Sequence, residues 1–307
     1  MAPSSHPFPL PIVDHHAHLH PGAPGLEATR RFAALGGTHL FLATQSYRPG
    51  APGSVEEYRE QFETTVAIAA KVQESVSVLT YPVVAPYPVD LIGQAERLGL
   101  TSAEDLQRRA LREAARFVEE GRAVALGEVG RAHFPVPEGV REAQERVLRE
   151  AVALARDVGC PLVLHTEDLD GEGYRGLEAL ARQEGLSPER LVKHYTRTYR
   201  DPKERFGITP SFLAKRPLVR QALTDPGPWF LETDYLDDPQ RPGAVLSLET
   251  VPRRARELWE GEAGAGSSAD RERQLAIPFV EAPRRLYGLS FSRPEPFRFG
   301  EPGGGGP

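Results

Sequence analysis

Histidine is concentrated near the start of the chain, in the segment Asp14-His15-His16-Ala17-His18. Side chains alternate across a β-strand, so His16 and His18 face the same way. Two imidazoles at this spacing can hold one metal ion from the end of a strand, and Asp14 on the same face can hydrogen-bond a ligand histidine. Such a segment alone is more often structural than metal-binding, so a metal site needs further ligands from elsewhere in the chain.

Four later apolar runs also end in a residue that can bind a metal ion. These residues are Glu128, His165, His194 and Asp234. Buried carboxylates and imidazoles are costly unless they are paired or bind a metal. In a barrel of parallel strands the C-terminal ends converge on one face, where such folds place their active sites. We therefore predict one site built from His16, His18, Glu128, His165, His194 and Asp234.

These residue types suit two divalent ions. Glu128 can offer one carboxylate oxygen to each ion, while His16 and His18 complete one ion with Asp234, and His165 and His194 hold the other. Mixed nitrogen and oxygen ligands favour Zn, Mn, Fe or Co, and Mg less well, so the metal identity stays open. Two ions about 3.5–4 Å apart can share a hydroxide and make it a nucleophile at neutral pH. We predict catalytic roles for Glu128 and Asp234, with Asp234 taking the proton from that water and delivering it to the leaving group.

Other polar residues near the same strand ends are candidates for substrate contacts. Arg131 and His133 follow Glu128, and substrate contact or ordinary loop packing are equally compatible with their positions. Tyr195 and Arg197 belong to a basic, aromatic loop at residues 195–200, which can stack a base and hold a phosphate or form a salt-bridged lid. We assign Arg131, His133, Tyr195 and Arg197 to substrate binding.

Two charged residues near the predicted ligands are expected to point away from the site. Lys193 precedes His194 by one residue, and Glu232 precedes Asp234 by two. From the alternation along their strands we expect both side chains to face the surrounding helices rather than the site.

Short apolar runs alternate with longer amphipathic segments along the whole chain. Strands are predicted at residues 11–16, 38–43, 75–85, 122–127, 161–165, 191–194, 206–209 and 229–233. Helices are predicted at residues 26–35, 54–74, 101–120, 138–159, 171–184, 250–260 and 269–287, with another between the last two strands. This alternation predicts a parallel sheet with right-handed crossovers. Eight units favour a single (β/α)8 TIM-type barrel with additional C-terminal helices, and an open doubly wound sheet is the alternative.

Length and composition limit the remaining possibilities. The 307 residues fit one barrel over residues 1–290, followed by a flexible tail rich in Pro and Gly at 291–307. The net charge of −6 argues against an extended grip on duplex nucleic acid. Cys160 is the only cysteine, which excludes an intrachain disulfide. Without a signal-like start or an apolar run of about 18 residues, we expect a cytoplasmic protein that does not enter membranes.

The segments that carry the ligands resemble the TatD family of metal-dependent hydrolases, within the amidohydrolase superfamily. The matches are the Asp-x-His-x-His run at Asp14–His18, the Gly-Glu-Val-Gly run at Gly127–Gly130, His165 and His194 at strand ends, and the Leu-Glu-Thr-Asp run at Leu231–Asp234. In addition, Pro283–Tyr287 is similar to the closing helix of the family. The resemblance implies a (β/α) barrel, the same ligands, and hydrolysis with Mg- or Zn-type ions. In characterised relatives this is often nuclease activity on single strands.

The chain departs from the family pattern where the substrate would bind. The family usually has His-x-Arg after the fifth strand, and here Glu167 stands in place of the arginine. The usual His-Cys-Phe-Ser/Thr-Gly is replaced by the run His194–Arg197, and the small residue and Pro after the last Asp by Tyr235–Asp238. An acidic Glu167 would repel a phosphodiester. We therefore predict a divergent TatD-related branch.

Three functions follow from these observations. The leading hypothesis is a dinuclear hydrolase in which a metal-bridging hydroxide attacks a phosphate ester, as in a nuclease or phosphodiesterase, with Arg131 and Arg197 holding the phosphate. The substrate would be a small molecule or a short nucleic acid. The alternative is hydrolysis of an amide, lactone or aminoacyl ester on the same metals, with Glu167 binding a substrate amine. A non-catalytic, metal-stabilised scaffold is disfavoured because structural zinc sites usually have closed, cysteine-rich shells.

Overall fold

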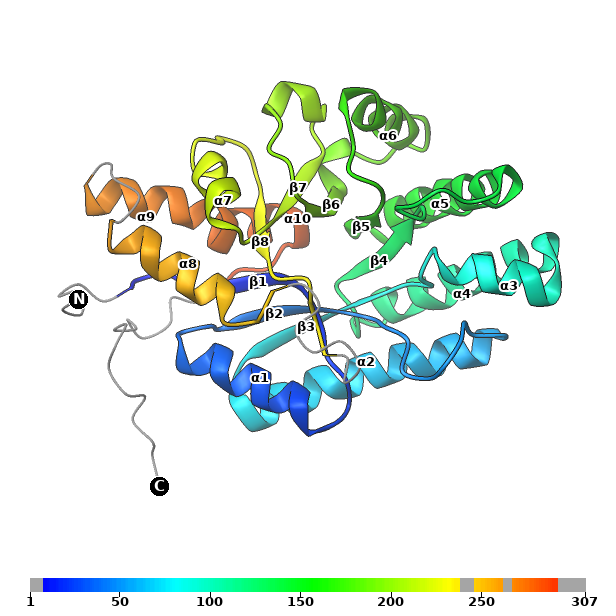
Figure 1. Ribbon diagram of the computed structural model, residues 1–307, viewed down its shortest axis with the longest axis horizontal. Helices are drawn as coiled ribbons and strands as arrows, with labels where there is room; N and C mark the ends of the chain where they lie inside the picture. Colours follow the sequence, from blue (N-terminus) through cyan, green and yellow to red (C-terminus); the bar gives the residue numbers. More distant parts are fainter. Residues whose placement is uncertain (1–7, 238–245, 262–266, 292–307) are drawn as a thin grey trace.

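The computed structural model describes residues 8–237, 246–261 and 267–291, and its centre is a curled parallel sheet (Figure 1). The strands follow the order β8-β7-β6-β5-β4-β3-β2-β1-β9, and every neighbouring pair is parallel. The strands are β1 (Val13–His18), β2 (His39–Ala43), β3 (Leu79–Val84), β4 (Ala125–Gly130), β5 (Leu162–His165), β6 (Leu191–Thr196), β7 (Thr209–Leu213), β8 (Phe230–Glu232) and β9 (Tyr235–Leu236). β9 follows β8 after two residues and pairs with β1, so the two ends of the sheet are consecutive in the chain.

Helices connect most successive strands and pack on the outside of the curled sheet (Figure 1). They are α1 (Ala23–Ala34), α2 (Val55–Val76), α3 (Asp90–Leu98), α4 (Leu100–Glu119), α5 (Glu138–Val158), α6 (Gly171–Gln183), α7 (Arg216–Ala222), α8 (Thr250–Trp259), α9 (Ser268–Ala276) and α10 (Ala282–Tyr287). Short 3-10 turns lie at Pro188–Arg190 and Pro202–Arg205, and a π-helical turn at Ile277–Glu281 joins α9 to α10. The prediction of an α/β fold with strands and helices in alternation is therefore confirmed. Of the residues described, no helix is both long enough and apolar enough to pass through a membrane.

Local signals explain where several helices begin and end. The hydroxyl oxygen of Ser54 accepts a hydrogen bond from the backbone N–H of Glu57 and caps α2. Helix α5 ends at Gly159, whose φ of 72° lies in the left-handed region that glycine adopts without strain. Capping residues therefore set the boundaries of the helices that connect the strands.

Several predicted boundaries are wrong; for example, the strand predicted at 122–127 is β4 at 125–130, and three others have a local cause. The strand predicted at 206–209 starts only at Thr209, because residues 206–208 still belong to the turn that follows the 3-10 helix at Pro202–Arg205, and it continues through Pro210 to Leu213. The strand predicted from residue 75 starts at Leu79, because α2 extends to Val76. The helix predicted from residue 101 is the second of two, since α3 fills residues 90–98 and Gly99, with φ of 79°, turns the chain between them.

The C-terminal helix α10 lies at the N-terminal ends of the strands. The carbonyl oxygen of Leu286 accepts a hydrogen bond from Arg190, which directly precedes β6. Phe291 packs on His39, the first residue of β2, with ring centroids 3.9 Å apart. The hydroxyl of Tyr287 is 2.7 Å from Nε2 of His15, inside the sheet. The opposite face, formed by the C-terminal strand ends, therefore remains for the functional site.

Candidate metal centre

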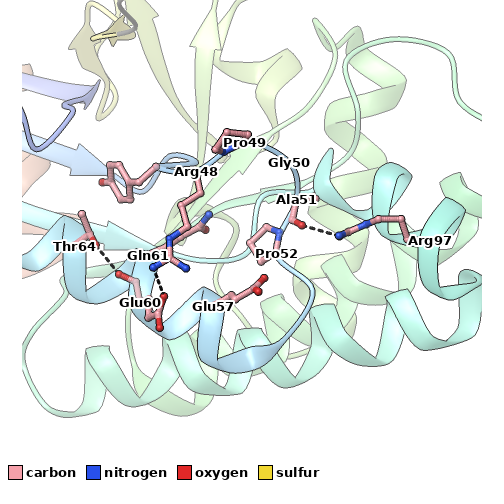
Figure 2. Close-up of a pocket in the computed structure, with 11 residues that line it drawn as sticks. Arg48, Pro49, Gly50, Ala51, Pro52, Glu57, Glu60, Gln61, Thr64 and Arg97 are labelled. Atoms are coloured by element: carbon pink, nitrogen blue, oxygen red, sulfur yellow. Dashed lines mark hydrogen bonds and ion pairs between the residues drawn. The ribbon is translucent and has the colours of Figure 1, made fainter.

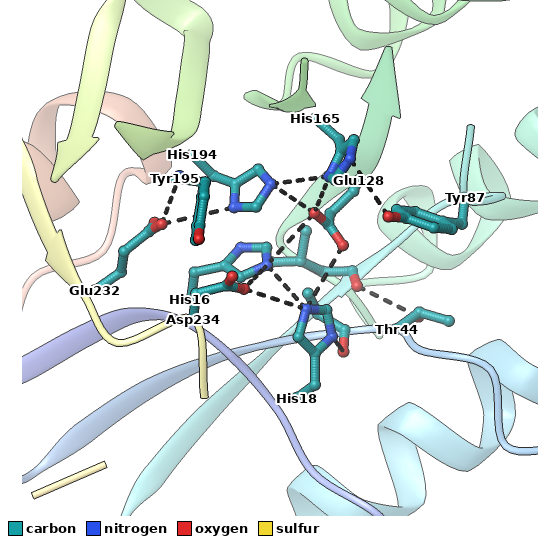
Figure 3. Close-up of polar contacts among 12 residues, drawn as sticks. His16, His18, Thr44, Tyr87, Glu128, His165, His194, Tyr195, Glu232 and Asp234 are labelled. Carbon is teal, nitrogen blue, oxygen red and sulfur yellow. Dashed lines mark hydrogen bonds and ion pairs between the residues drawn. The ribbon is translucent and has the colours of Figure 1, made fainter. Parts of the chain in front are cut away.

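All six predicted ligands come together at the C-terminal ends of the strands (Figure 3). Glu128 lies in the middle: its Oε1 is 2.6 Å from Nε2 of His194 and 3.0 Å from Nδ1 of His165. On the other side, Oε1 is 3.7 Å from Nε2 of His16, and Oε2 is 3.6 Å from Nε2 of His18. This arrangement matches the predicted position of Glu128 between two pairs of histidines.

Asp234 approaches the centre from the segment between β8 and β9. Its Oδ1 is 3.8 Å from Nε2 of His16 and 3.7 Å from Nε2 of His18. The residue has a φ of 50°, a left-handed conformation that aspartate tolerates better than most residues. Its backbone N–H donates to the carbonyl oxygen of His16 at 3.0 Å, which fixes the turn against β1.

The spacing of the donor atoms fits divalent metal ions. Two imidazole nitrogens bound at about 2.0–2.1 Å to one tetrahedral ion are roughly 3.3 Å apart. Nε2 of His16 and Nε2 of His18 are 3.2 Å apart, and so are Nδ1 of His165 and Nε2 of His194. The donors form three overlapping groups, which are His16-His18-Glu128, Glu128-His165-His194 and His16-His194-Asp234.

Two glycines let β4 place Glu128 at this position. A Cβ at Gly127 would lie 2.6 Å from Cβ of Val163 on β5, so a side chain there would push the two strands apart. Gly130 has a φ of 137°, and a Cβ there would lie 2.3 Å from the carbonyl oxygen of His165. The Gly-Glu-Val-Gly run therefore reflects close approach of β4 to β5 on both sides of Glu128.

Buried charged side chains at the centre shift one another's pKa values. Burial alone would raise the pKa of Glu128, but the charge of His194 and hydrogen bonds from His165 and His194 hold this pKa well below its usual range. Burial would lower the pKa of His194, but the carboxylates of Glu128 and Glu232 outweigh it and raise this pKa to about 10. The buried carboxylates thus favour positive charge between them, which is the condition for holding cations.

Glu232 was assigned to the helix-facing side, and this is wrong. Its Oε1 is 3.6 Å from Nδ1 of His194 and accepts a hydrogen bond from the backbone N–H of Tyr195 at 2.5 Å. Residues two apart in a strand face the same way, so alternation itself places Glu232 on the side of Asp234, and the helix-facing expectation did not follow from it. Lys193 is buried, and its ammonium donates to the carbonyl oxygen of His194 at 2.5 Å.

Asp14 has a different partner from the one predicted. Its carboxylate accepts hydrogen bonds from the backbone N–H and the hydroxyl of Thr233, at 3.1 and 2.7 Å, and from the backbone N–H of His16 at 3.2 Å. It therefore ties β1 to the segment that carries Asp234, and it contacts no ligand imidazole. The register irregularity in β1 after Asp14 explains why alternation misplaced this side chain.

The outward nitrogen of His165 meets two residues from neighbouring loops. Nε2 of His165 is 3.0 Å from Nδ1 of His133 and 3.3 Å from the hydroxyl of Tyr87. His133 was predicted at the site and lies there. Tyr87 was missed, although it stands in the Pro-Tyr-Pro run that follows β3, and a tyrosine at the end of a strand is a signal that sequence analysis could use.

Arg131 and Glu167 neutralise one another. The guanidinium of Arg131 lies 2.7 Å from Glu167 and 2.8 Å from Glu145, and Arg141 lies 3.8 Å from Glu167. The assignment of Arg131 to a substrate phosphate is therefore not supported, because two carboxylates already surround it. For the same reason, the argument that Glu167 repels a phosphodiester or binds a substrate amine loses its basis.

The end of β6 and the loop after it carry the other two predicted contacts, since Tyr195 lies in the strand and Arg197 just beyond it. Tyr195 follows His194 directly, with a φ of 53°, and the exposed guanidinium of Arg197 lies 5.2 Å from the centroid of its ring. Arg197 forms no ion pair with any residue that the structure describes. Arg200 donates instead to the carbonyl oxygen of Leu169 at 2.7 Å, so the predicted salt-bridged lid is not formed within the described residues.

A separate pocket lies between the loop after β2, helix α2 and Arg97 of α3 (Figure 2). Its volume is about 210 Å³. Arg48 pairs with Glu60 at 2.8 Å, and Arg97 donates to the carbonyl oxygen of Ala51 at 2.6 Å. None of the six candidate ligands lines this pocket, so it is not part of the metal centre.

Structural comparison finds the same fold in proteins of low sequence identity. A TatD-like protein of Archaeoglobus fulgidus matches with a TM-score of 0.59 and 14% identity, over 90% of this chain and 100% of that one. A TatD homologue of Escherichia coli matches with a TM-score of 0.59 and 19% identity, over 91% and 98% of the two chains. The phosphotriesterase homology protein of Escherichia coli matches with a TM-score of 0.56 and 13% identity, over 91% and 99%.

Sequence comparison identifies the family. An uncharacterized protein of Methanocaldococcus jannaschii is 32% identical over 257 residues, which cover 82% of this chain and 88% of that protein. The family model of TatD related DNase matches residues 13–268, a range that includes all six residues of the centre. The chain therefore belongs to the TatD-related DNase family and is a metal-dependent hydrolase.

Proposed function

We propose that this protein hydrolyses phosphate esters, as a phosphodiesterase or nuclease, on a centre of two divalent ions. The observation that carries the proposal is the position of Glu128, which contacts His165 and His194 on one side and faces His16 and His18 on the other. One carboxylate between two pairs of imidazoles is the arrangement that suits a pair of ions. Divalent ions held there supply a Lewis acid and lower the pKa of water.

The two carboxylates would have different tasks. The side chain of Glu128 is 6% exposed and in contact with imidazoles on both sides, so it serves as a ligand. The side chain of Asp234 is 15% exposed, which leaves it more accessible to water and substrate. Asp234 is therefore the better candidate to accept the proton of the attacking water and return it to the leaving oxygen.

The charges around the centre support a phosphate ester over a carbonyl substrate. Glu167, the acid that spoke against a phosphodiester, is paired with Arg131. Arg197, close to His194 in the chain, is exposed and has no carboxylate partner among the described residues, so it is free to contact an anion. The same fold also occurs in the phosphotriesterase homology protein of Escherichia coli, which carries a phosphate in its active site.

Hydrolysis of a carbonyl substrate is the second candidate. The fold is shared with an organophosphate hydrolase engineered from a weakly active lactonase and with an isopropylaminohydrolase of Burkholderia multivorans. The observation in its favour is the ligand set itself: four imidazoles and two carboxylates suit hydrolysis of a carbonyl compound as well as of a phosphate ester. The non-catalytic scaffold is not proposed further, because the family is a hydrolase family.

The test compares both substrate classes on protein of known metal content. Bis-p-nitrophenyl phosphate and short single-stranded oligonucleotides are offered with Mn, Mg, Zn and Co, beside lactones and aminoacyl esters. We expect phosphodiester turnover that chelation abolishes and that Glu128→Gln lacks. Lactone or ester turnover without phosphodiesterase activity would favour the second candidate. No phosphodiester turnover with any metal, in fully loaded protein, would overturn the proposal.

We also infer that the sheet is a (β/α)8 TIM-type barrel in which β8 and β9 together form the eighth strand, within one catalytic domain over residues 1–290. The pairing of β9 with β1 and the contacts of α10 and Phe291 with the N-terminal strand ends support this view. The predicted flexible tail falls almost entirely on residues 292–307, which lie outside the described residues. A short nucleic acid or small phosphate ester as substrate and a cytoplasmic location stay predictions.

A further inference from the structure

An exposed aromatic ring stands two ring contacts away from the metal centre. Phe134, on the loop between β4 and α5, is 40% exposed, and its ring meets that of His133 edge-on, with centroids 5.0 Å apart at 90°. The ring of His133 in turn lies 5.2 Å from that of His165, one of the six candidate ligands. A single exposed hydrophobic residue is ordinary by itself, but these ring contacts connect Phe134 to the centre.

The loop that carries Phe134 is fixed on both sides. The backbone N–H of Ala132 donates to Gln144 at 3.2 Å, and the carbonyl oxygen of Ala132 accepts from Arg141 at 3.2 Å. Pro135 and Pro137 follow, and each limits the backbone to a narrow range of φ. A restrained loop that exposes a large ring toward solvent loses little conformational entropy when a ligand covers that ring.

A second aromatic group lies on the other side of His165. In the sheet, β5 stands between β4 and β6, and β6 carries Tyr195 near its end, with the guanidinium of Arg197 over its ring. The centre is thus flanked by a flat ring on the β4 side and by an aromatic–cation pair on the β6 side. This combination suits a phosphodiester that bears a planar group, because the ring stacks while the cation contacts a phosphate.

From this geometry we propose that Phe134 is the stacking platform for a nucleobase next to the scissile phosphate of a single strand. The proposal rests on the phosphodiesterase function proposed above and deepens it by naming a binding subsite. Stacking on an exposed ring does not distinguish among bases, so the subsite would bind single strands with little sequence preference. A duplex would not use it, because its bases are already stacked and paired.

The test uses the metal-loaded, full-length protein and two matched strands. One strand is a short oligothymidylate, and the other has abasic residues in place of the nucleotides around the cleavage site. The variants are Phe134→Ala and Phe134→Tyr, which keeps a ring. Leu98→Ala is the control, since Leu98 is similarly exposed, at 42%, but lies on α3.

We expect Phe134→Ala to raise the KM of the oligothymidylate about 5- to 150-fold, the range for losing one stacked base. The kcat should change little, Phe134→Tyr and Leu98→Ala should resemble the wild type, and the abasic strand should respond to none of them. Binding of a phosphorothioate strand, which resists hydrolysis, is measured by fluorescence anisotropy and should weaken by the same factor in Phe134→Ala. This readout does not depend on turnover.

Two results would overturn the subsite. The first is an unchanged KM and anisotropy for the base-bearing strand in Phe134→Ala, and the second is an equal loss for both strands. Either result leaves the hydrolase proposal standing as long as the wild type cleaves phosphodiesters. If the loaded wild type cleaves neither strand, the proposed function fails, and the anisotropy comparison still decides whether Phe134 binds bases.

Discussion

The effect of Glu167 on a substrate depends more on the side chains around its carboxylate than on its position after His165. Arg131 and Arg141 lie within ion-pair distance of its carboxylate, and Arg131 also contacts Glu145. An acid whose charge is balanced by adjacent cations exerts little net field on a substrate. The replacement of the family's arginine by Glu167 therefore does not by itself exclude a phosphodiester.

This view predicts that Glu167→Gln changes the KM for a phosphodiester by no more than about twofold, as expected for a partly exposed ion pair. Arg131→Ala should raise the same KM, because it leaves the carboxylates of Glu167 and Glu145 without their shared cation. The KM of each variant is measured by steady-state kinetics at fixed ionic strength. A large drop in KM for Glu167→Gln would mean that its carboxylate does face the substrate.

At the level of elements, the centre depends on how closely neighbouring strands approach. β4 can bring Glu128 beside His165 only because Gly127 leaves room for Val163 of β5. Core positions that lack space for a methyl group typically lose about 1–3 kcal/mol of stability when one is added. Glycine at this position is therefore a packing requirement that serves the metal centre.

We predict that Gly127→Ala destabilises the protein by about 1–3 kcal/mol and lowers its metal content. The control is Gly176→Ala in α6, where an added Cβ meets no atom within 4 Å and the change should stabilise the helix by up to about 1 kcal/mol. Urea unfolding measures the free energy of unfolding of each variant and of the wild type. Equal stability of Gly127→Ala and the wild type would contradict the close-packing argument.

The elements also show what the sequence could predict. The strand-end residues were found because a polar residue after an apolar run marks the mouth of a parallel sheet. Asp14 was misplaced because β1 has a register irregularity after it, and strict alternation holds only in a regular strand. Glu232 was misplaced because alternation was applied as if it were one residue from Asp234, when residues two apart share a face. The partners of Arg131 come from α5 and the loop after β5, and no local pattern encodes such contacts.

For the whole molecule, the two ends of the sheet have separate tasks. The C-terminal strand ends carry the six candidate ligands, and the N-terminal ends are covered by α10 and Phe291. Tyr287 reaches His15, which stacks on Phe230 at 3.9 Å inside the sheet. Changes at this end should therefore affect stability without affecting the centre.

Tyr287→Phe tests this separation. It keeps the ring but removes the hydroxyl that lies 2.7 Å from His15, and the loss should destabilise the protein by about 1–3 kcal/mol. Metal content and kcat per folded molecule should stay at wild-type values. The matched control is Tyr199→Phe, a ring stacked on Phe212 at 6.0 Å, which should change neither quantity. A loss of metal from folded Tyr287→Phe would show that the two ends are coupled.

The central claim is that six side chains from five strand ends hold a pair of divalent ions around Glu128. Its most direct test is the metal content per chain, measured by elemental analysis on purified full-length protein and on Glu128→Gln. Two ions per chain are expected in the wild type, and at least one should be lost in Glu128→Gln while the variant remains folded. One ion or none in the wild type, or an unchanged content in the variant, would contradict it.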